Sequence, residues 1–231
     1  MKRHKLTTSL VTTYIGFIAT AHASAPQPLF SPEQEVRKQK MFALSVMENQ
    51  ANLLHDPDTP AYGPENAKVA VIEFFDYQCV FCNRFAPELE KVMKAQPDVR
   101  YLFKDWPIFG GRWEASLQAA QQGLTVWQKK GPQAYVTYHN AIYATGHNEG
   151  KLTVEDIHGA ASKAGLAAPA PGDHTASLEK NSNLAEALGL TGTPGIIVMP
   201  VSGATPDTIT VFPEAVTADR LQVAIRKATS R

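Results

Sequence analysis

Residues 71–89 of the chain are VIEFFDYQCVFCNRFAPEL, and this stretch sets the frame of the fold. The run KVAVIEFFD, residues 68–76, is apolar on both faces except at Glu73, as expected for a central buried strand. A helical pattern with an expected kink at Pro87 follows over residues 80–96. The sequence therefore predicts a buried strand that turns directly into a helix.

The two cysteines of the chain, Cys79 and Cys82, lie at this strand-to-helix turn. The free N–H groups of a helix N-terminus favour a thiolate, so Cys79 is expected to titrate low and to attack readily. Cys82, one turn into the helix, is placed to resolve a mixed disulfide by attacking the first sulfur. Two thiols in such unequal environments form a redox pair.

Two other interpretations of this pair remain open. An inert disulfide would close a very small loop and would restrict little chain entropy, so it would be a poor stabiliser. A closed zinc site needs two further ligands, and the histidines of the mature chain are scattered without metal-ligand spacing, at positions 55, 139, 147, 158 and 174. No metal site is predicted, although copper or zinc binding by the same cysteines stays an alternative.

The sequence that follows this strand and helix predicts an α/β domain. Residues 99–106 predict a second strand, which completes a strand–helix–strand unit. About 80 residues of helical pattern follow, and two strands and a closing helix are then expected at residues 195–199, 208–212 and 217–227. The order is βαβ, a helical block, then ββα.

The first 23 residues have the features of a signal peptide. A basic start precedes a short apolar stretch, and Ala21-His22-Ala23 matches the small-x-small cleavage pattern. Cleavage after Ala23 is expected, with export of the mature chain into an oxidising compartment.

The composition of the 231 residues fits a folded protein without a charged face. The hydrophobic content of 44% excludes disorder as the main state. The 22 basic and 22 acidic residues give a formal net charge of zero, which gives no electrostatic support for nucleic-acid binding.

Residues 24–56 predict an N-terminal helical arm. Ser31 is the expected N-cap, with Pro32 at the first helical position and Gln34 at the capping-box position, and the helix is expected to end near Leu54. Two roles are open for it: packing on its own domain, or oligomerisation.

The CVFC motif after FFDYQ, the βαβ frame, the helical block and the later pair Thr193-Pro194 resemble the Dsb thiol-disulfide oxidoreductases of the bacterial periplasm. The resemblance covers the chain from about Pro57 to its C-terminus. It implies a thioredoxin-like α/β fold over residues 57–107 and 177–231, with a DsbA-type helical insertion at 108–176. The arm is similar in placement to the oligomerisation arms of DsbC, DsbG and the copper-sensitivity-suppressor relatives.

The resemblance also implies roles for individual residues. Cys79 matches the attacking cysteine, Cys82 the resolving one, and Pro194 the cis-proline whose loop faces the active site and binds the substrate peptide together with Thr193. Threonine before this proline is found in the isomerase branch, where the DsbA oxidases carry valine. This favours isomerisation or reduction over oxidation, with a DsbA-type oxidase as the alternative.

Glu73 lies where the family places a buried acid. A lone carboxylate in an apolar strand is expected to have a raised pKa, and it can exchange a proton with Cys82. Lys104, on the neighbouring predicted strand, is a candidate ion-pair partner for Glu73. A structural Glu73–Lys104 pair without a kinetic role is the alternative to a proton relay.

The resemblance implies an enzyme that needs no cofactor and acts in the periplasm. Its expected partners are protein substrates with cysteines and a membrane redox partner, and it is expected to form a homo-oligomer through the N-terminal helix. No nucleic-acid partner is expected.

Overall fold

The computed structural model describes residues 31–167 and 171–230, so the predicted signal peptide 1–23 and residues 24–30 of the predicted arm lie outside the described residues. The described chain forms a five-stranded sheet in the order β1-β3-β2-β4-β5. Strands β2 and β3 are parallel, and the other neighbouring strands are antiparallel. The strands are β1 Ala61–Tyr62, β2 Val69–Phe75, β3 Arg100–Asp105, β4 Gly195–Pro200 and β5 Thr210–Phe212.

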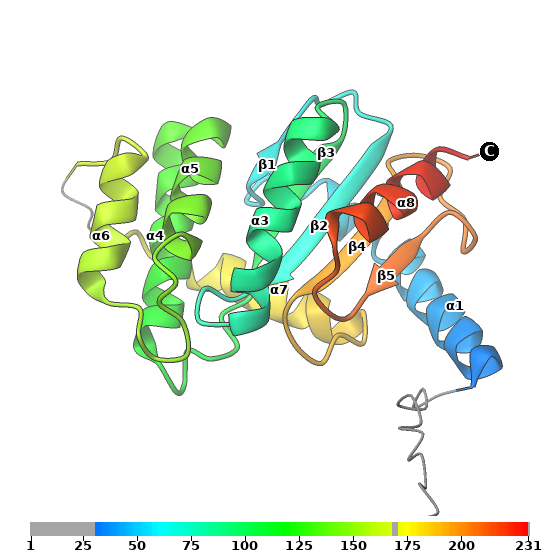
Figure 1. Cartoon of the computed structure of the whole chain (residues 1–231), viewed down its shortest axis with the longest axis horizontal. Coiled ribbons are helices and arrows are strands. Elements are labelled where there is room, and N and C mark those ends of the chain that lie inside the picture. The colour runs from blue at the N-terminus through cyan, green and yellow to red at the C-terminus, as the bar shows by residue number, and fades with distance from the viewer. Residues whose placement is uncertain (1–30, 168–170, 231) are drawn as a thin grey trace, which may run out of the picture.

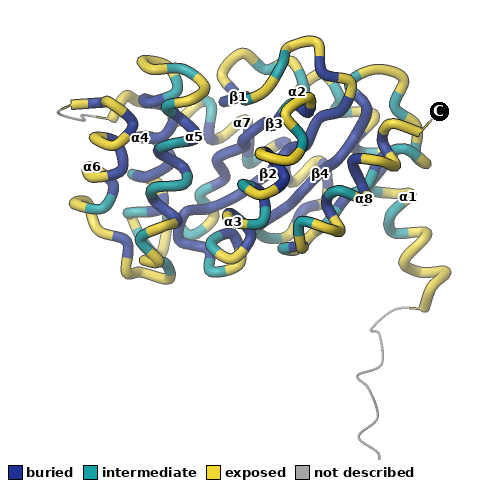
Figure 2. The backbone as a smooth tube through the Cα atoms, turned by 45° about the horizontal axis from the view of Figure 1, so that its top comes forward, coloured by how far each residue is buried: buried dark blue, intermediate teal, exposed yellow. Residues whose placement is uncertain are grey.

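Helices cover both faces of this sheet (Figure 1). Helices α3 (Val80–Ala95) and α8 (Ala218–Thr229) pack on one face, whereas α1 (Pro32–Glu48), α2 (Gln50–Leu54) and α7 (Thr175–Ala187) pack on the other. The predicted βαβ–helices–ββα order is confirmed, and the seven residues of β2 are all buried, as expected for a central strand (Figure 2).

The helical insertion lies beside the sheet, between β3 and α7 in the chain (Figure 1). Its helix α6 begins with a capping box in which Thr153 and Asp156 bond to each other's backbone. Buried tyrosines of α5 join the core cluster that contains α3 and α8, so the insertion and the sheet share one core. The three helices are α4 Glu114–Lys130, α5 Pro132–Tyr143 and α6 Val154–Lys163.

The N-terminal helix begins as expected and packs on its own domain over its second half. The capping box of Ser31 and Gln34 is present, but the helix breaks at Asn49 into α1 and the short α2. Ala43 and Val46 of α1 are buried in the core cluster on the second face of the sheet. This contact favours packing on its own domain, whereas Met41 and Leu44 on the other side of α1 are exposed.

Strand β1 was not predicted. The sequence around it is rich in proline and glycine and has no strand periodicity, yet Ala61 and Tyr62 pair with Leu102 and Tyr101 of β3. A two-residue strand has no periodicity of its own, so only its pairing with β3 defines it. No helix among the described residues has the length and hydropathy needed to cross a membrane.

Candidate active site

Cys79 is the N-cap of α3, at the turn where β2 ends. Its backbone N–H donates to the carbonyl of Asp76 at 3.0 Å, and its carbonyl accepts from the Asn83 N–H at 3.0 Å, which begins the helix. Cys82 lies one turn further and is fully buried. Both cysteines are thiols in this structure. The predicted position of the pair, at a helix N-terminus, is confirmed.

The two thiols have opposite acidities. The pKa of Cys79 is lowered to about 6, chiefly because the Cys82 side chain donates a hydrogen bond to it. Burial opposes this effect, while the Thr193 side chain and the N–H groups of Phe81 and Cys82 add to it. Burial raises the pKa of Cys82 well above its ordinary value, and the hydrogen bond to Cys79 and the charge of Cys79 raise it further. At neutral pH Cys79 is therefore mostly a thiolate and Cys82 a protonated thiol.

The loop before β4 faces Cys79. The Thr193–Pro194 peptide bond is cis, as the resemblance implied. The Cys79 thiol donates to the Thr193 carbonyl, with 3.2 Å between sulfur and oxygen. The Thr193 hydroxyl has no partner in this geometry among the described residues, so it is free to turn to the thiolate when Cys79 ionises. The structure thus brings Thr193 and Pro194 to Cys79, although they are more than 110 residues away in the chain.

Asp76, at the end of β2, holds the catalytic turn against the insertion. Its carboxylate accepts from the Gln78 N–H at 2.7 Å, the Phe109 N–H at 2.9 Å and the Ser116 hydroxyl at 2.7 Å. Burial raises the pKa of Asp76, and these three hydrogen bonds oppose that rise. This role of Asp76 was not predicted, although its position directly between the strand and the CxxC motif was a usable signal.

The insertion also contacts the residue that precedes Cys79. The Glu149 N–H donates to the Gln78 carbonyl at 2.9 Å, and the Gly150 N–H donates to the Gln78 side-chain oxygen at 2.7 Å. Gly150 has a φ of +91°, and a Cβ there would lie 2.7 Å from the Trp113 ring nitrogen. Only glycine allows this close approach, so the loop from α5 to α6 helps to fix the catalytic turn.

Glu73 lies in the middle of β2 on the sheet face covered by α3. Its side chain is 1% exposed, and neither carboxylate oxygen has a hydrogen-bond partner among the described residues. Burial raises the pKa of Glu73 to about 8, and the charges of Asp105 and Cys79 contribute to the rise. The expected raised pKa is confirmed.

The prediction that Lys104 pairs with Glu73 is wrong. Glu73 of β2 pairs in register with Phe103 of β3, so Lys104, one residue further, points to the opposite face of the sheet. A shift of one residue in this register would have put the two side chains on the same face. The predicted role of Lys104 at the active site is therefore corrected to a structural one.

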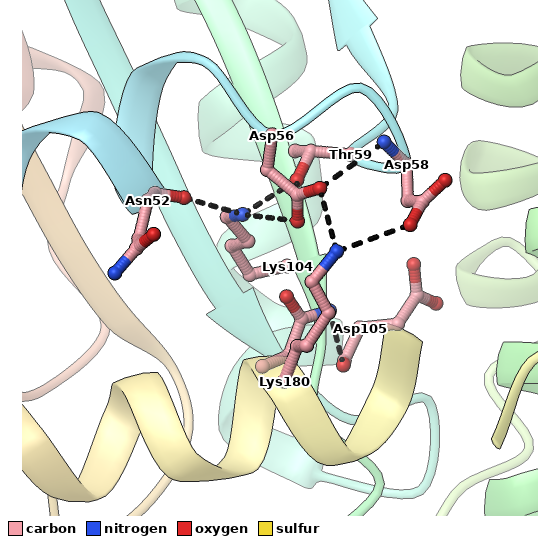
Figure 3. Close-up of polar contacts among 8 residues, drawn as sticks. Asn52, Asp56, Asp58, Thr59, Lys104, Asp105 and Lys180 are labelled. Carbon is pink, nitrogen blue, oxygen red and sulfur yellow. Dashed lines mark hydrogen bonds and ion pairs between the residues drawn. The ribbon is translucent and has the colours of Figure 1, made fainter. Parts of the chain in front are cut away.

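Lys104 instead anchors the segment that follows α2 (Figure 3). Its ammonium donates to the Asn52 carbonyl at 3.0 Å and to the Thr59 hydroxyl, and it forms an ion pair with Asp56 at 3.4 Å. Lys180 of α7 also binds Asp56, at 3.0 Å. Burial lowers the pKa of Lys104, and the charge of Asp56 opposes this shift.

Potential metal ligands do not gather at the site. Among residues 31–167 and 171–230, no group of three or more His, Cys, Asp or Glu side chains is placed to hold a metal ion. The chemistry that the thiol geometry supports is that of the two sulfurs: attack by the Cys79 thiolate on a disulfide, and resolution by Cys82. A buried acid beside a dithiol at a helix N-terminus, facing a cis-proline loop, defines a thiol-disulfide oxidoreductase.

Comparison with known proteins agrees with this class. A family described as thioredoxin matches residues 55–217, and the chain belongs to this family. The resemblance to the periplasmic Dsb-like members is confirmed by solved structures. None of the curated proteins compared with the chain matches it.

Three solved structures are similar over most of their length. BcfH of Salmonella enterica Typhimurium is 38% identical with a TM-score of 0.76, over 86% of this chain and 84% of that one. The catalytic domain of Proteus mirabilis ScsC is 28% identical with a TM-score of 0.68, over 81% and 98% of the two chains. A periplasmic thioredoxin-like protein of Salmonella enterica serovar Typhimurium is 28% identical with a TM-score of 0.65, over 78% and 95%.

Proposed function

We propose that this oxidoreductase acts on protein disulfides, with isomerisation or reduction favoured over oxidation. The observation that carries the proposal is the opposite shift of the two thiol pKa values, lowered to about 6 for Cys79 and raised well above the ordinary value for Cys82. Cys79 attacks a substrate disulfide as a thiolate, whereas Cys82 rests as a thiol. The mixed disulfide therefore persists long enough for a second substrate thiol to displace Cys79 and rearrange the pairing.

The moderate acidity of Cys79 supports isomerisation or reduction over oxidation. Its pKa of about 6 lies between the values of about 7 in thioredoxin and about 3.5 in the strong oxidant DsbA. A less stabilised thiolate makes the reduced form less favourable and the disulfide a weaker oxidant. Thr193 before the cis-proline, the residue type of the isomerase branch, supports the same direction.

Refolding of a scrambled multi-disulfide protein by the reduced enzyme tests the proposal. Recovery of native pairing is expected, and Cys79→Ser is expected to abolish it. Cys82→Ser keeps the nucleophile, so it is expected to retain isomerisation and to lose net reduction. An enzyme that oxidises a reduced substrate but does not rearrange a scrambled one would overturn the proposal in favour of an oxidase.

We further infer that the enzyme works in the periplasm, on protein substrates with cysteines, and that a membrane protein restores its redox state. The basic start and the cleavage pattern at Ala23 support export, as does the periplasmic description of one Salmonella relative. Sequencing the N-terminus of the exported protein is expected to give Ser24 first. The Cys82→Ser variant is expected to trap a membrane protein as a mixed disulfide, and trapping of soluble proteins alone would contradict that partner.

The proposed homo-oligomer uses the free side of α1. Ala43 and Val46 face the core, whereas Met41 and Leu44, on the other side of the same helix, are exposed. The exposed fractions of Met41 and Leu44 are 64% and 46%. A soluble helix with apolar side chains on both sides is best explained when a second copy of the helix covers the outer one.

Charged substitutions on this outer side test the oligomer without disturbing the core. Met41→Glu together with Leu44→Glu is expected to lower the sedimentation mass and to leave the melting temperature of each protomer nearly unchanged. Deletion of the whole arm is a poorer test because Ala43, Val46 and Leu53 belong to the core. An unchanged sedimentation mass in the double variant would contradict the role of the arm.

A further inference from the structure

His139, on α5 of the helical insertion, reaches into the core beneath the cysteines. The helix packs against α3 (Figure 1), and the His139 side chain is 1% exposed. Its ring lies within aromatic contact distance of five other rings, those of Phe75, Tyr77, Phe103, Tyr135 and Tyr143. An imidazole held this deeply has a fixed orientation.

The orientation presents a lone pair to the interior. His139 Nδ1 lies 3.0 Å from the side-chain oxygen of Asn140, which can only accept, so Nδ1 carries the ring proton. Nε2 is then unprotonated, and it has no hydrogen-bond partner among the described residues. An acceptor left unpaired in a buried site needs a donor that the resting geometry has not yet brought into contact.

The group that faces this acceptor is Glu73. His139 Nε2 and the nearer Glu73 oxygen are 3.9 Å apart, and both oxygens of Glu73 are likewise without a partner. A movement of about 1 Å in either side chain would close this gap to hydrogen-bond length. The polar group nearest to Glu73 therefore comes from the helical insertion and not from Lys104, the predicted partner.

We propose that His139 is a positioning residue that exchanges a proton with Glu73, and that this exchange lets Glu73 act as either proton acceptor or proton donor for Cys82. The inference rests on the dithiol chemistry of the proposed function. It gives the helical insertion a part in the reaction beyond packing.

The pKa values of Glu73 and His139 determine which of the two groups is protonated at neutral pH. The pKa of Glu73 is raised to about 8 by burial, and the pKa of His139 is lowered to about 4 by burial. Between these values Glu73 is protonated and His139 is neutral, so the pair presents one proton donor facing one acceptor. The other titratable groups packed around the pair are Asp105 of β3, Cys79 and Cys82 at the start of α3, Tyr77 of the turn, and Tyr135, Tyr138 and Tyr143 of α5.

Resolution of a mixed disulfide begins with two proton transfers and ends with the exchange of one disulfide bond for another. The Glu73 proton moves to His139 Nε2, and the Cys82 thiol gives its proton to the freed carboxylate. The Cys82 thiolate attacks the Cys79 sulfur, the Cys79–Cys82 bond forms, and the bond from Cys79 to the substrate sulfur breaks. The substrate sulfur leaves as a thiolate and is thereby reduced, the Cys82 sulfur is oxidised as it enters the disulfide, and the imidazolium returns its proton to solvent. In the reverse reaction Glu73 protonates the departing Cys82.

Stopped-flow reaction of the reduced enzyme with Ellman's reagent separates the two steps. The first release of the coloured thiolate reports attack by Cys79, and the second reports resolution by Cys82. His139→Gln can hydrogen-bond but cannot take the proton, so it is expected to slow the second release about tenfold or more near pH 7. It is also expected to change the pH profile of that release and to leave the first release within about twofold.

Two comparisons show that the effect passes through Glu73. Glu73→Gln is expected to slow the second release as well, and the double variant is expected to be no slower than Glu73→Gln alone. His147→Gln, the same substitution on an exposed histidine of the insertion, is the matched control and is expected to leave both releases unchanged.

Three results would overturn the inference. They are a wild-type rate of the second release in His139→Gln, additive slowing of that release in the double variant, and ring ¹⁵N shifts of His139 in the unaltered protein that do not change with pH. The last is measured by ¹⁵N NMR, where the ring shifts are expected to follow the titration of Glu73. Loss of the first release, in contrast, would refute the proposed function and not the role of His139.

Discussion

Replacement of Cys82 by alanine tests what keeps Cys79 ionised. The hydrogen bond from the Cys82 side chain is the largest single cause of the low Cys79 pKa of about 6. A hydrogen bond to a charged group contributes about 1.5–3 kcal/mol, and one pKa unit corresponds to about 1.4 kcal/mol. Cys82→Ala is therefore expected to raise the pKa of Cys79 by about 1–2 units.

The consequence for reactivity is large at neutral pH. With a pKa of about 6, about 90% of Cys79 is thiolate at pH 7, and the expected rise lowers this to between about 50% and about 10%. The titration is followed by the ultraviolet absorbance of the thiolate and by the rate of alkylation with iodoacetamide as a function of pH. Cys82→Ser is the matched control, because its hydroxyl can still donate, and its Cys79 is expected to stay within about half a unit of the wild type.

An unchanged Cys79 pKa in Cys82→Ala would refute this account. The remaining donors would then have to hold the thiolate, namely the Thr193 side chain and the N–H groups of Phe81 and Cys82. In that case Thr193→Val, which removes the hydroxyl at nearly constant shape, would be expected to raise the pKa instead.

Three further predictions concern stability. Lys104→Ala leaves the Asn52 carbonyl and the Thr59 hydroxyl without their donor and removes one of the two cations at the half-buried Asp56. The free energy of unfolding in urea is therefore expected to fall by about 2 kcal/mol, and a loss below about 1 kcal/mol would contradict the anchoring role. Folding lowers the pKa of Cys79 from 9.0 to about 6, so its thiolate stabilises the reduced protein above pH 6, and this contribution is lost as the pH falls through 6. Between pH 5 and pH 7 the free energy of unfolding of the reduced form is expected to rise by about 1 kcal/mol relative to that of the oxidised form. If urea unfolding gave the same difference between the two forms at both pH values, the lowered pKa of Cys79 would be contradicted. Asp76→Ala leaves two buried donors and one half-buried donor unpaired, so it is expected to cost about 3 kcal/mol. Asp76→Asn is expected to cost less, and equal losses in thermal unfolding would count against the hydrogen bonds as the cause.

The elements of the sheet and its helices could be predicted because each has a local signature. The predicted strand at residues 68–76 is found at Val69–Phe75, and the Ser31 capping box begins α1 where expected. The periodicity and the caps that produce these elements act within a few residues. The break at Asn49 escaped prediction because no proline or glycine marks it.

The candidate site was predicted in part. The position of Cys79 and Cys82 followed from the pattern around them, and the pairing with Thr193 and Pro194 followed from the family resemblance. His139 and Asp76 were missed because their roles depend on what surrounds them. A single buried histidine has no sequence pattern that distinguishes it from one on the surface.

The amino-acid sequence alone determined a buried strand, a cysteine pair at a helix N-terminus and a separate helical block. Strand and helix periodicity and the spacing of the cysteines are local properties of the chain, so they can be found without the tertiary structure. Only the tertiary structure showed which groups meet. The register between β2 and β3 turns Lys104 away from Glu73, and the packing of α5 brings His139 to it. A register shift of one residue reverses the face of every side chain in a strand, and the pKa of a buried acid depends on neighbours from other segments. Both are properties of long-range packing, which no local pattern specifies.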